Sequence, residues 1–392
     1  MIGQSTRMKK VRLSRIREIM EYCSQLEKQG RTIINLTNGE PDFVTPEYIR
    51  NAAKKALDKG ITGYAPTIGV EYLRAAVVKK LKRENHVSYG THEILITNGG
   101  TQSTFLGMTA FLNPGDEVIL PDPGYTIYPE IAKLAGAAVK TYTLKRERGF
   151  QIDIGELNRA ITARTKLLLL LSPSNPTGAV LTRETLEGVA EAVRGKDILV
   201  LSDEVYERLL YGSKKHFSIA EIPGMREQTI ILNSFSKTYA MTGWRIGYVA
   251  APERFIEPMM RLNAITTCGA NHFVQWAATC ALEEENGACE EMRRAYEDRL
   301  RGVVSQIRGI RGLSCEMPDG AFYVFINIEG TGMGSEAFVR YLIDEASVAL
   351  VPGNAFGGAG EGYVRMCCAK SAEELAEAVR RIGEAVRKLN IA

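Results

Sequence analysis

A lysine that could bind an aldehyde lies in the segment SFSKTYAMTGWRIGY, residues 234–248. Lys237 stands among hydroxyl-bearing side chains, including Ser234 and Ser236, and Arg245 follows shortly after. Hydroxyl groups and a cation suit a dianionic phosphate, and a lysine amine can form a Schiff base with a carbonyl carbon. The flanking apolar runs predict strand, polar turn and strand. The segment indicates either a site for pyridoxal 5′-phosphate (PLP) or a basic surface turn with solvated charges.

Other groups of polar residues directly follow predicted strands. In a parallel sheet the functional residues gather at the carboxyl ends of the strands. Residues 99–101, GGT, open a helix whose free N–H groups could bind phosphate, although glycine pairs also simply make turns. Residues 174–178, SNPTG, fit a ligand loop or a plain Asn-Pro turn. Asp203, with Tyr206 close behind, ends an apolar strand, where a carboxylate needs a cation partner or a capping role. Gly39 either lets a ligand approach the backbone or makes a turn.

Strands and helices that alternate along the chain must position these residues. Apolar strands alternate with amphipathic helices from residue 93 to residue 236, which predicts a parallel sheet covered by helices on both faces. Only a few residues separate the strand before Ser236 from the next, which begins near Trp244, whereas a parallel crossover needs about a dozen. We therefore expect the strand IGYVAAP to run antiparallel in a mixed sheet.

The two ends of the chain predict a second, smaller α+β domain. Apolar residues at helical spacing predict a helix over residues 13–26, and Thr45 is the expected N-cap of the next helix, with proline at its first position. Helices dominate after the sheet region, and short strands and helices then alternate to the C-terminus. The predicted domains are a large one, residues 45–284, and a small one, residues 1–44 and 285–392.

Composition narrows the class of protein. The chain has 392 residues, more than the roughly 100–200 of one domain, and its net charge of +3 is too small to indicate nucleic acid. Its seven cysteines include no C-x-x-C pair, which favours reduced thiols in the cytoplasm over a disulfide framework or a zinc site, so we expect no metal. No apolar run reaches the ~18 residues of a membrane span, so we expect no membrane contact.

The motifs SPSNPTG, SDEVYE and SFSKTYAMTGWRIGY, in this order, resemble those of the class I/II aminotransferases, the aspartate aminotransferase-like family of fold type I PLP enzymes. NGEPDF, GYAPTIGVEYLR, NGGTQS, PDPGYTIYPE and GYVRMCCA also match in kind and order, so the resemblance covers essentially the whole chain. It implies an α/β fold with a mixed, mostly parallel sheet, a small domain built from both termini, and a homodimer with shared active sites.

The resemblance also implies a role for each candidate residue. The catalytic residues would be Lys237, Asp203 and Tyr206. The residues implied to bind PLP are Gly100, Thr101, Tyr125, Asn175, Asp203, Tyr206, Ser234, Ser236, Lys237, Arg245 and Tyr64 of the partner subunit. Those implied to bind the substrate carboxylate are Gly39, Asn175 and Arg365. In this scheme Asp203 keeps the pyridine nitrogen protonated, so that the ring can accept electrons.

Two positions depart from the family pattern. Thr101 stands where many aspartate-preferring members have a lysine that meets the distal carboxylate, which puts a strict aspartate preference in question. His272 stands where the family often has serine, and it is either a packed core residue or one that points at the pocket.

The implied function is a cytoplasmic enzyme that transfers the amino group of an L-amino acid to a 2-oxo acid, 2-oxoglutarate, by a ping-pong mechanism. The donor stays open among aspartate, aromatic amino acids and alanine. A C–S β-lyase on the same fold is the alternative enzyme. A ligand-sensing regulator of this fold would need a DNA-binding domain ahead of the large domain, where residues 1–44 show no helix-turn-helix pattern.

Overall fold

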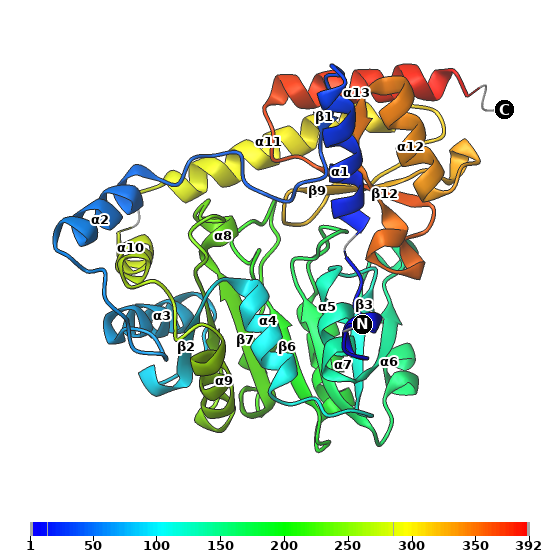
Figure 1. Cartoon of the computed structure of the whole chain (residues 1–392). Coiled ribbons are helices and arrows are strands. Elements are labelled where there is room, and N and C mark those ends of the chain that lie inside the picture. Colours follow the sequence, from blue (N-terminus) through cyan, green and yellow to red (C-terminus); the bar gives the residue numbers. More distant parts are fainter. Residues whose placement is uncertain (1–2, 14, 285, 390–392) are drawn as a thin grey trace.

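The computed structural model describes residues 3–13, 15–284 and 286–389 of the chain. A body built around a large sheet occupies the lower part of Figure 1, and a smaller body with blue, yellow, orange and red elements lies above it. The residues outside the description, all in the predicted small-domain segments, are 1–2, 14, 285 and 390–392.

Seven strands of the described chain form the large sheet, in the order β2-β8-β7-β6-β5-β3-β4. Their bounds are β2 Ile94–Thr97, β3 Glu117–Asp122, β4 Ala138–Thr143, β5 Thr165–Leu171, β6 Leu199–Asp203, β7 Thr229–Ser234 and β8 Gly247–Ala250. β8 pairs antiparallel with both β2 and β7, whereas the other neighbours pair parallel. The predicted mixed sheet with an antiparallel IGYVAAP strand is confirmed.

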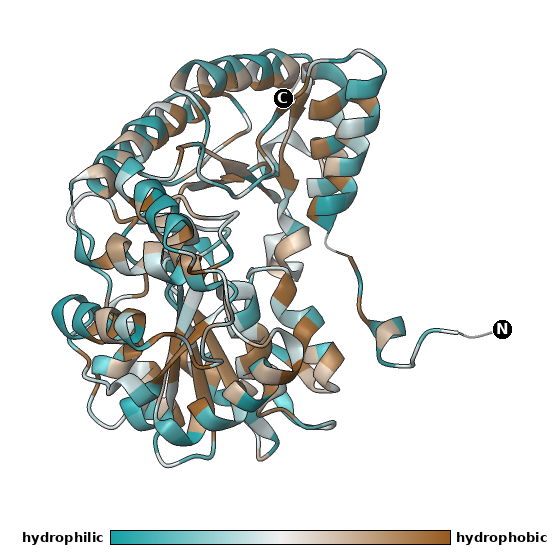
Figure 2. Cartoon of the chain, turned by 60° about the vertical axis from the view of Figure 1, so that its left-hand side comes forward, coloured by the Kyte–Doolittle hydropathy of each residue, from teal (hydrophilic) through white to brown (hydrophobic). Residues whose placement is uncertain are grey.

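Helices cover both faces of this sheet, and β5 shows why its sequence is apolar throughout. Leu167, Leu169 and Leu171 join one core, and Leu168 and Leu170 join the core on the opposite face. The covering helices are α2 Glu47–Asp58, α3 Glu71–Glu84, α4 Gly100–Thr109, α5 Ile127–Ala135, α6 Ile154–Ala160, α7 Arg183–Val193, α9 Glu253–Thr266 and α10 His272–Glu283. Figure 2 shows brown, apolar strands enclosed by helices that carry teal, polar outer surfaces. A strand buried on both faces has no polar alternation.

The smaller body combines both ends of the chain. Its strands are β1 Ile34–Asn35, β9 Tyr323–Asn327, β10 Val348–Ala349, β11 Val351–Pro352 and β12 Tyr363–Cys367, and its helices are α1 Arg15–Lys28, α11 Ala288–Arg308, α12 Ser335–Ala346 and α13 Ala372–Arg387. β1 pairs parallel with β10, and one core joins Cys23 to Val386. This core also includes Tyr206, Leu209, Tyr211 and Ala240, so the two bodies pack against each other. We propose that residues 45–284 form one domain and the flanking segments the other. None of the described helices is long and apolar enough to cross a membrane.

Some local predictions are wrong. α1 begins at Arg15, and Leu13, expected on its apolar face, is 69% exposed. Thr45 is not a helix cap, because its hydroxyl donates to the Ala240 carbonyl oxygen at 2.6 Å and accepts from Trp244 Nε1 at 2.9 Å. A tertiary contact has thus replaced the expected local one.

The polar segment between β7 and β8 also differs from its prediction. It contains one turn of helix, α8 Phe235–Thr238, where only a polar turn was predicted. The Ser234 side chain accepts a hydrogen bond from Ser236 N at 3.1 Å and so caps this turn. Lys237 is therefore carried on a short helix that starts at the end of β7.

β8 passes very close to the loop that opens α4, which predicts a sensitive glycine. A Cβ on Gly247 would lie 2.8 Å from the Asn233 carbonyl oxygen and 3.2 Å from Gly100 N. We expect Gly247→Ala to lower the free energy of unfolding by about 1–3 kcal/mol, because backbone must move to make room. Urea unfolding measures this loss. Gly243→Ala is the control, since its Cβ would meet nothing within 4 Å; equal stability of the two variants would contradict the close approach.

Candidate functional site

A cavity of about 510 Å³ lies between the two bodies. Twelve of the residues that the sequence nominated line it: Gly39, Gly100, Thr101, Tyr125, Asn175, Asp203, Tyr206, Ser234, Ser236, Lys237, Arg245 and Arg365. The large body contributes the residues that follow β2, β5, β6 and β7, so the ends of these strands form one wall. The smaller body contributes the opposite wall, including Arg365 on β12 and Tyr323 on β9.

Lys237 is enclosed in this cavity without a carboxylate partner among the described residues. Its Nζ donates to the Gly39 carbonyl oxygen at 2.5 Å and lies 5.9 Å from the centre of the Phe322 ring. Burial lowers the pKa of Lys237 to about 8, because the charged ammonium loses water. A substantial fraction of the amine is therefore unprotonated, and nucleophilic, at mildly alkaline pH.

Asp203 has a hydroxyl partner rather than the cation expected from the sequence. Tyr128 Oη donates to Asp203 Oδ2 at 2.6 Å, and Val205 N donates to Oδ1 at 3.3 Å. Burial raises the pKa of Asp203 to about 6, although these two hydrogen bonds act to lower it. Tyr128 was missed by sequence reasoning, even though it stands in the same motif as Tyr125, whose ring contacts it edge-on at 5.5 Å between centroids.

A pair of tyrosines joins the two walls of the cavity. The hydroxyl oxygens of Tyr206 and Tyr323 lie 2.8 Å apart in a buried hydrogen bond. A Cβ at Gly39 would collide with the Tyr323 hydroxyl, so this position requires glycine. No local pattern identifies Tyr323, because it lies 117 residues from Tyr206 in the chain.

One end of the cavity gathers donors for an anion. The first turn of α4, with Gly100 at its start, leaves backbone N–H groups free and directs the positive end of the helix dipole at the cavity. The Ser234 and Ser236 hydroxyls lie 2.9 Å apart beside it. Arg245 donates through Nη1 to the Thr242 carbonyl oxygen at 2.7 Å, and its guanidinium packs against Gly99. This arrangement fits a phosphate dianion.

The opposite end holds a buried cation without a counter-charge. Arg365 is 1% exposed, and it forms no ion pair with a carboxylate of the described residues. Its Nη1 donates to Asn175 Oδ1 at 3.1 Å, its Nη2 donates to the Thr37 carbonyl oxygen, and its Nε has no partner. A buried charge with an unused donor is costly unless a ligand supplies the anion. This end of the cavity therefore suits a carboxylate.

Two nominated residues lie outside the cavity. Tyr64 is 94% exposed on its loop. His272 begins α10, half-buried, and is neither part of the apolar core nor of the cavity wall.

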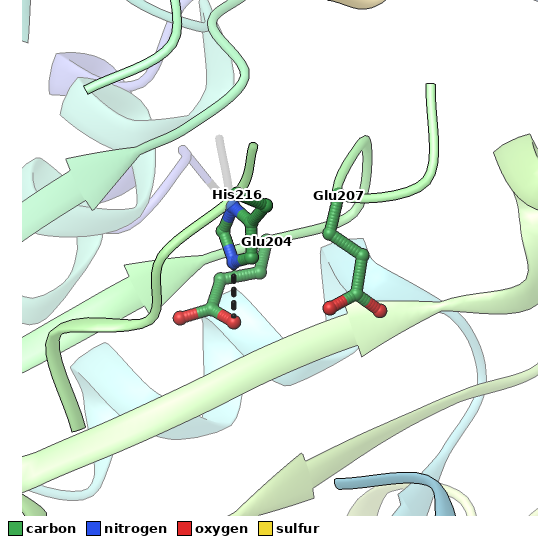
Figure 3. Close-up of side chains that lie close together, drawn as sticks. All are labelled: Glu204, Glu207 and His216. Atoms are coloured by element: carbon green, nitrogen blue, oxygen red, sulfur yellow. Dashed lines mark hydrogen bonds and ion pairs between the residues drawn. The ribbon is translucent and has the colours of Figure 1, made fainter. Parts of the chain in front are cut away.

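A second polar cluster lies beside the site. Glu204, Glu207 and His216 place one ligand atom each within 4.8 Å of one another. Figure 3 shows these three side chains close together, with the contact between His216 and Glu204 dashed. His216 Nε2 lies 3.0 Å from Glu204 Oε2, and Lys80 Nζ binds the carboxylate of Glu207. Burial alone would lower the pKa of His216, but Glu204 raises it overall. Each carboxylate of the cluster thus has a basic partner, His216 for Glu204 and Lys80 for Glu207, and we assign the cluster a structural role.

The cluster supports the anion-binding end of the cavity. Asn233 Nδ2 donates to Glu207 Oε1 at 2.6 Å, and Asn233 Oδ1 accepts from Ser234 N at 2.7 Å. Asn85 Nδ2 donates to Glu207 Oε2 at 2.6 Å. The carboxylate of Glu207 therefore fixes the end of β7 through one intervening side chain.

Comparisons with known proteins agree with this geometry. The family model described as aminotransferase class I and II matches residues 31–382. The chain is 42% identical to an aspartate aminotransferase of Pyrococcus abyssi, covering 99% of each chain, and 42% identical to aromatic-amino-acid aminotransferase 2 of Thermococcus litoralis, covering 98% of each. It is also similar to the structure of Thermus thermophilus aspartate aminotransferase with maleate, with a TM-score of 0.94 and 38% identity over 98% of this chain and 100% of that one.

Removing the cation from the cluster should destabilise the fold. Lys80→Met leaves the 7% exposed side chain of Glu207 without its ammonium partner, and we expect a loss of about 3–5 kcal/mol in the free energy of unfolding near pH 7. Lys79→Met, which removes a 70% exposed lysine paired with Glu283, should cost less than about 1 kcal/mol.

The pH dependence provides a second check. Burial opposes the ionisation of Glu207, but Lys80 and His216 bring its pKa below the ordinary value, so this stabilisation is present at neutral pH and is lost as the pH falls. The difference between wild type and Lys80→Met should therefore shrink below the ordinary glutamate pKa of about 4.3. A difference that is constant from neutral to acid pH would contradict the ion-pair explanation.

Proposed function

Because the chain belongs to the class I and II aminotransferase family, we propose that its cavity holds PLP and transfers an amino group from an L-amino acid to 2-oxoglutarate in two successive half-reactions. The observation that carries the proposal is Arg365, a buried guanidinium that lacks an anionic partner in the described chain, opposite a separate set of phosphate donors. The phosphate of a cofactor would bind the phosphate donors, and the carboxylate of a substrate would bind Arg365.

The residues present fit PLP by the chemistry of their donors. The phosphate would be held by Gly100, Thr101, Ser234, Ser236 and Arg245. Asp203 would pair with the protonated pyridine nitrogen, which gives its buried carboxylate the cation that it lacks. Asn175 and Tyr206 would donate to the phenol oxygen, and Tyr125 would stack on the ring. PLP, when bound, supplies an electron sink for the bonds at the α-carbon of the substrate.

The protein's own groups bind the substrate and move its protons. Arg365 binds the α-carboxylate through its fork of N–H groups, and Asn175, which already accepts from Arg365, orients the fork. Lys237 would hold the cofactor through its aldehyde. When free, its amine, whose pKa burial lowers to about 8 in this structure, would accept the α-proton of the substrate as a general base.

Similar proteins support a class of substrate, and the cysteines support a compartment. The similar proteins are named aspartate and aromatic-amino-acid aminotransferases, and one similar structure contains maleate, a dicarboxylate. We include dicarboxylic and aromatic amino acids among the donors of this chain. All seven cysteines carry free thiols, which supports a reducing compartment such as the cytoplasm.

Lys237→Ala should abolish transamination, because no other amine can bind the aldehyde or move the α-proton, while the phosphate donors still retain some PLP. Lys215→Ala, at an exposed lysine, should keep wild-type activity. Borohydride reduction of the native protein followed by peptide mapping should place the cofactor on Lys237.

A screen of amino donors against 2-oxoglutarate tests the reaction itself. Transfer to 2-oxoglutarate supports the proposal. Release of pyruvate and ammonia without any acceptor would indicate the β-lyase instead, and a label on a different lysine would reject the assignment of Lys237.

We also propose that the active unit is a homodimer with shared sites. Tyr64 is 94% exposed beside Gly63, as a side chain that a partner subunit covers would be. In a two-fold dimer one loop can serve each site reciprocally. The Tyr64 hydroxyl would then donate to the phosphate bound in the other subunit.

Complementation tests this arrangement. Tyr64→Phe should lose PLP on dilution faster than wild type, because one phosphate donor is gone. Mixed dimers of Tyr64→Phe and Lys237→Ala subunits contain one site with both lesions and one with neither, so they should recover activity toward one half of the native value. A monomer by light scattering that still turns over, or mixed dimers that show no recovery, would reject the shared site.

A further inference from the structure

A loop of the smaller body, residues 353–360, docks on the end of β3 in the large body. The backbone N–H of Ala359 donates to Asp122 Oδ1 at 3.0 Å, and the backbone N–H of Gly124 donates to the Phe356 carbonyl oxygen at 2.8 Å. Asp122 is the last residue of β3 and is partly buried. Its side chain therefore joins two segments that belong to different bodies and lie 237 residues apart in the chain.

The contact between Asp122 and the loop is close enough to require glycine. Gly357 has a φ of +134°, and a Cβ at this position would collide with the Asp122 carboxylate. Burial raises the pKa of Asp122, although the backbone N–H groups of Ala359 and Gly358 act to lower it. The carboxylate is thus held against backbone donors of the loop, and its position fixes theirs.

The 353–360 loop is closed on itself. A Cβ at Gly360 would collide with the Gly353 carbonyl oxygen, so the two ends of the loop touch. Gly360 N donates to the Gly357 carbonyl oxygen at 3.1 Å. A displacement at Gly357 therefore displaces the neighbouring Phe356 as well.

Phe356 connects this loop to the end of the cavity that suits a carboxylate. Its side chain is 4% exposed, and the guanidinium carbon of Arg365 lies 5.0 Å from the centre of its ring. The ring of Tyr323 lies 4.5 Å from the same guanidinium. The two rings limit where the guanidinium plane can lie, and so they limit the direction of its unpaired Nε.

We propose that Asp122 is a positioning residue of the proposed reaction: it holds the 353–360 loop on the large body, so that Phe356 keeps Arg365 aimed at the substrate carboxylate. This inference rests on the proposed function. Asp122 is not among the residues that line the cavity, so it acts through the loop and not on the ligand. Its loss should weaken the binding of carboxylates and leave the cofactor site, which belongs to the large body, in place.

Binding of glutarate to the PLP-loaded enzyme tests this role apart from turnover, because glutarate lacks the reactive carbonyl group of 2-oxoglutarate. We expect Asp122→Ala to weaken glutarate by roughly 3- to 30-fold in calorimetry, as is usual for coupling through packed neighbours. The KM for 2-oxoglutarate should rise by the same factor, whereas kcat and the dissociation constant of PLP should change by less than about twofold. A merely structural loss would change all four quantities together.

Three further variants separate the contact from general damage. Asp122→Asn keeps an acceptor oxygen for the Ala359 N–H and should retain most of the glutarate affinity. Gly357→Ala disturbs the same contact from the side of the loop and should weaken glutarate as Asp122→Ala does. Gly332→Ala is its control, since Gly332 also has a positive φ, +73°, but a Cβ there would meet nothing within 4 Å.

A double-mutant cycle tests the route through the aromatic ring. In a Phe356→Leu background Asp122→Ala should weaken glutarate little further, because both substitutions act on Arg365 through one contact. Unchanged glutarate affinity in Asp122→Ala and Gly357→Ala, losses that simply add in the cycle, or an equal fall in PLP affinity would overturn the proposal. Failure of the wild type to transaminate any pair would reject the proposed function instead, and the glutarate titration would still decide the role of Asp122.

Discussion

The reversal of chain direction between β7 and β8 is the constraint on which the site depends. β7 ends at Ser234, α8 carries Lys237, and β8 runs back from Gly247 between β7 and β2. Because β8 is antiparallel to its neighbours, its first residues lie at the edge where the parallel strands end. One short segment thus places an amine, two hydroxyls and the guanidinium of Arg245 against the first turn of α4. The tight passage of β8 at Gly247 is the steric requirement of this arrangement.

The charged side chains of the cavity differ in their surroundings and therefore in their roles. Burial moves the pKa of Asp203 up to about 6 and that of Lys237 down to about 8, because it disfavours the charged form of each group. Arg365 is buried and has no carboxylate partner among the described residues. It lines the cavity, where a ligand carboxylate could reach its unpaired Nε. The cluster of Glu204, Glu207, His216 and Lys80 pairs its carboxylates with basic side chains and supports the backbone at the end of β7. Lys237 and Arg365, which have no carboxylate partner among the described residues, both line the cavity, where the proposed ligands carry the opposite charge.

Much of the fold was predictable because its signals are local. Apolar strands alternating with amphipathic helices predicted a sheet covered on both faces, and the short link between the segments of Ser236 and Trp244 predicted an antiparallel neighbour, as observed. The nominated site residues also share a local signal, since most follow an apolar strand and parallel strands end at one edge. Local rules failed where a tertiary contact competed with them: the Thr45 hydroxyl bonds to Ala240 and Trp244 instead of capping α2.

By itself the sequence determined the strand and helix order, the antiparallel β8, the set of polar residues at the strand ends and, through its motifs, the family. Only the tertiary structure decided which distant groups meet: the hydroxyl of Tyr128 with Asp203, and, across the two bodies, Tyr206 with Tyr323. Periodicity reports which face of an element is buried, because burial repeats with the element's own geometry. The partners of a buried polar group follow from the packing of distant segments, which no local pattern encodes.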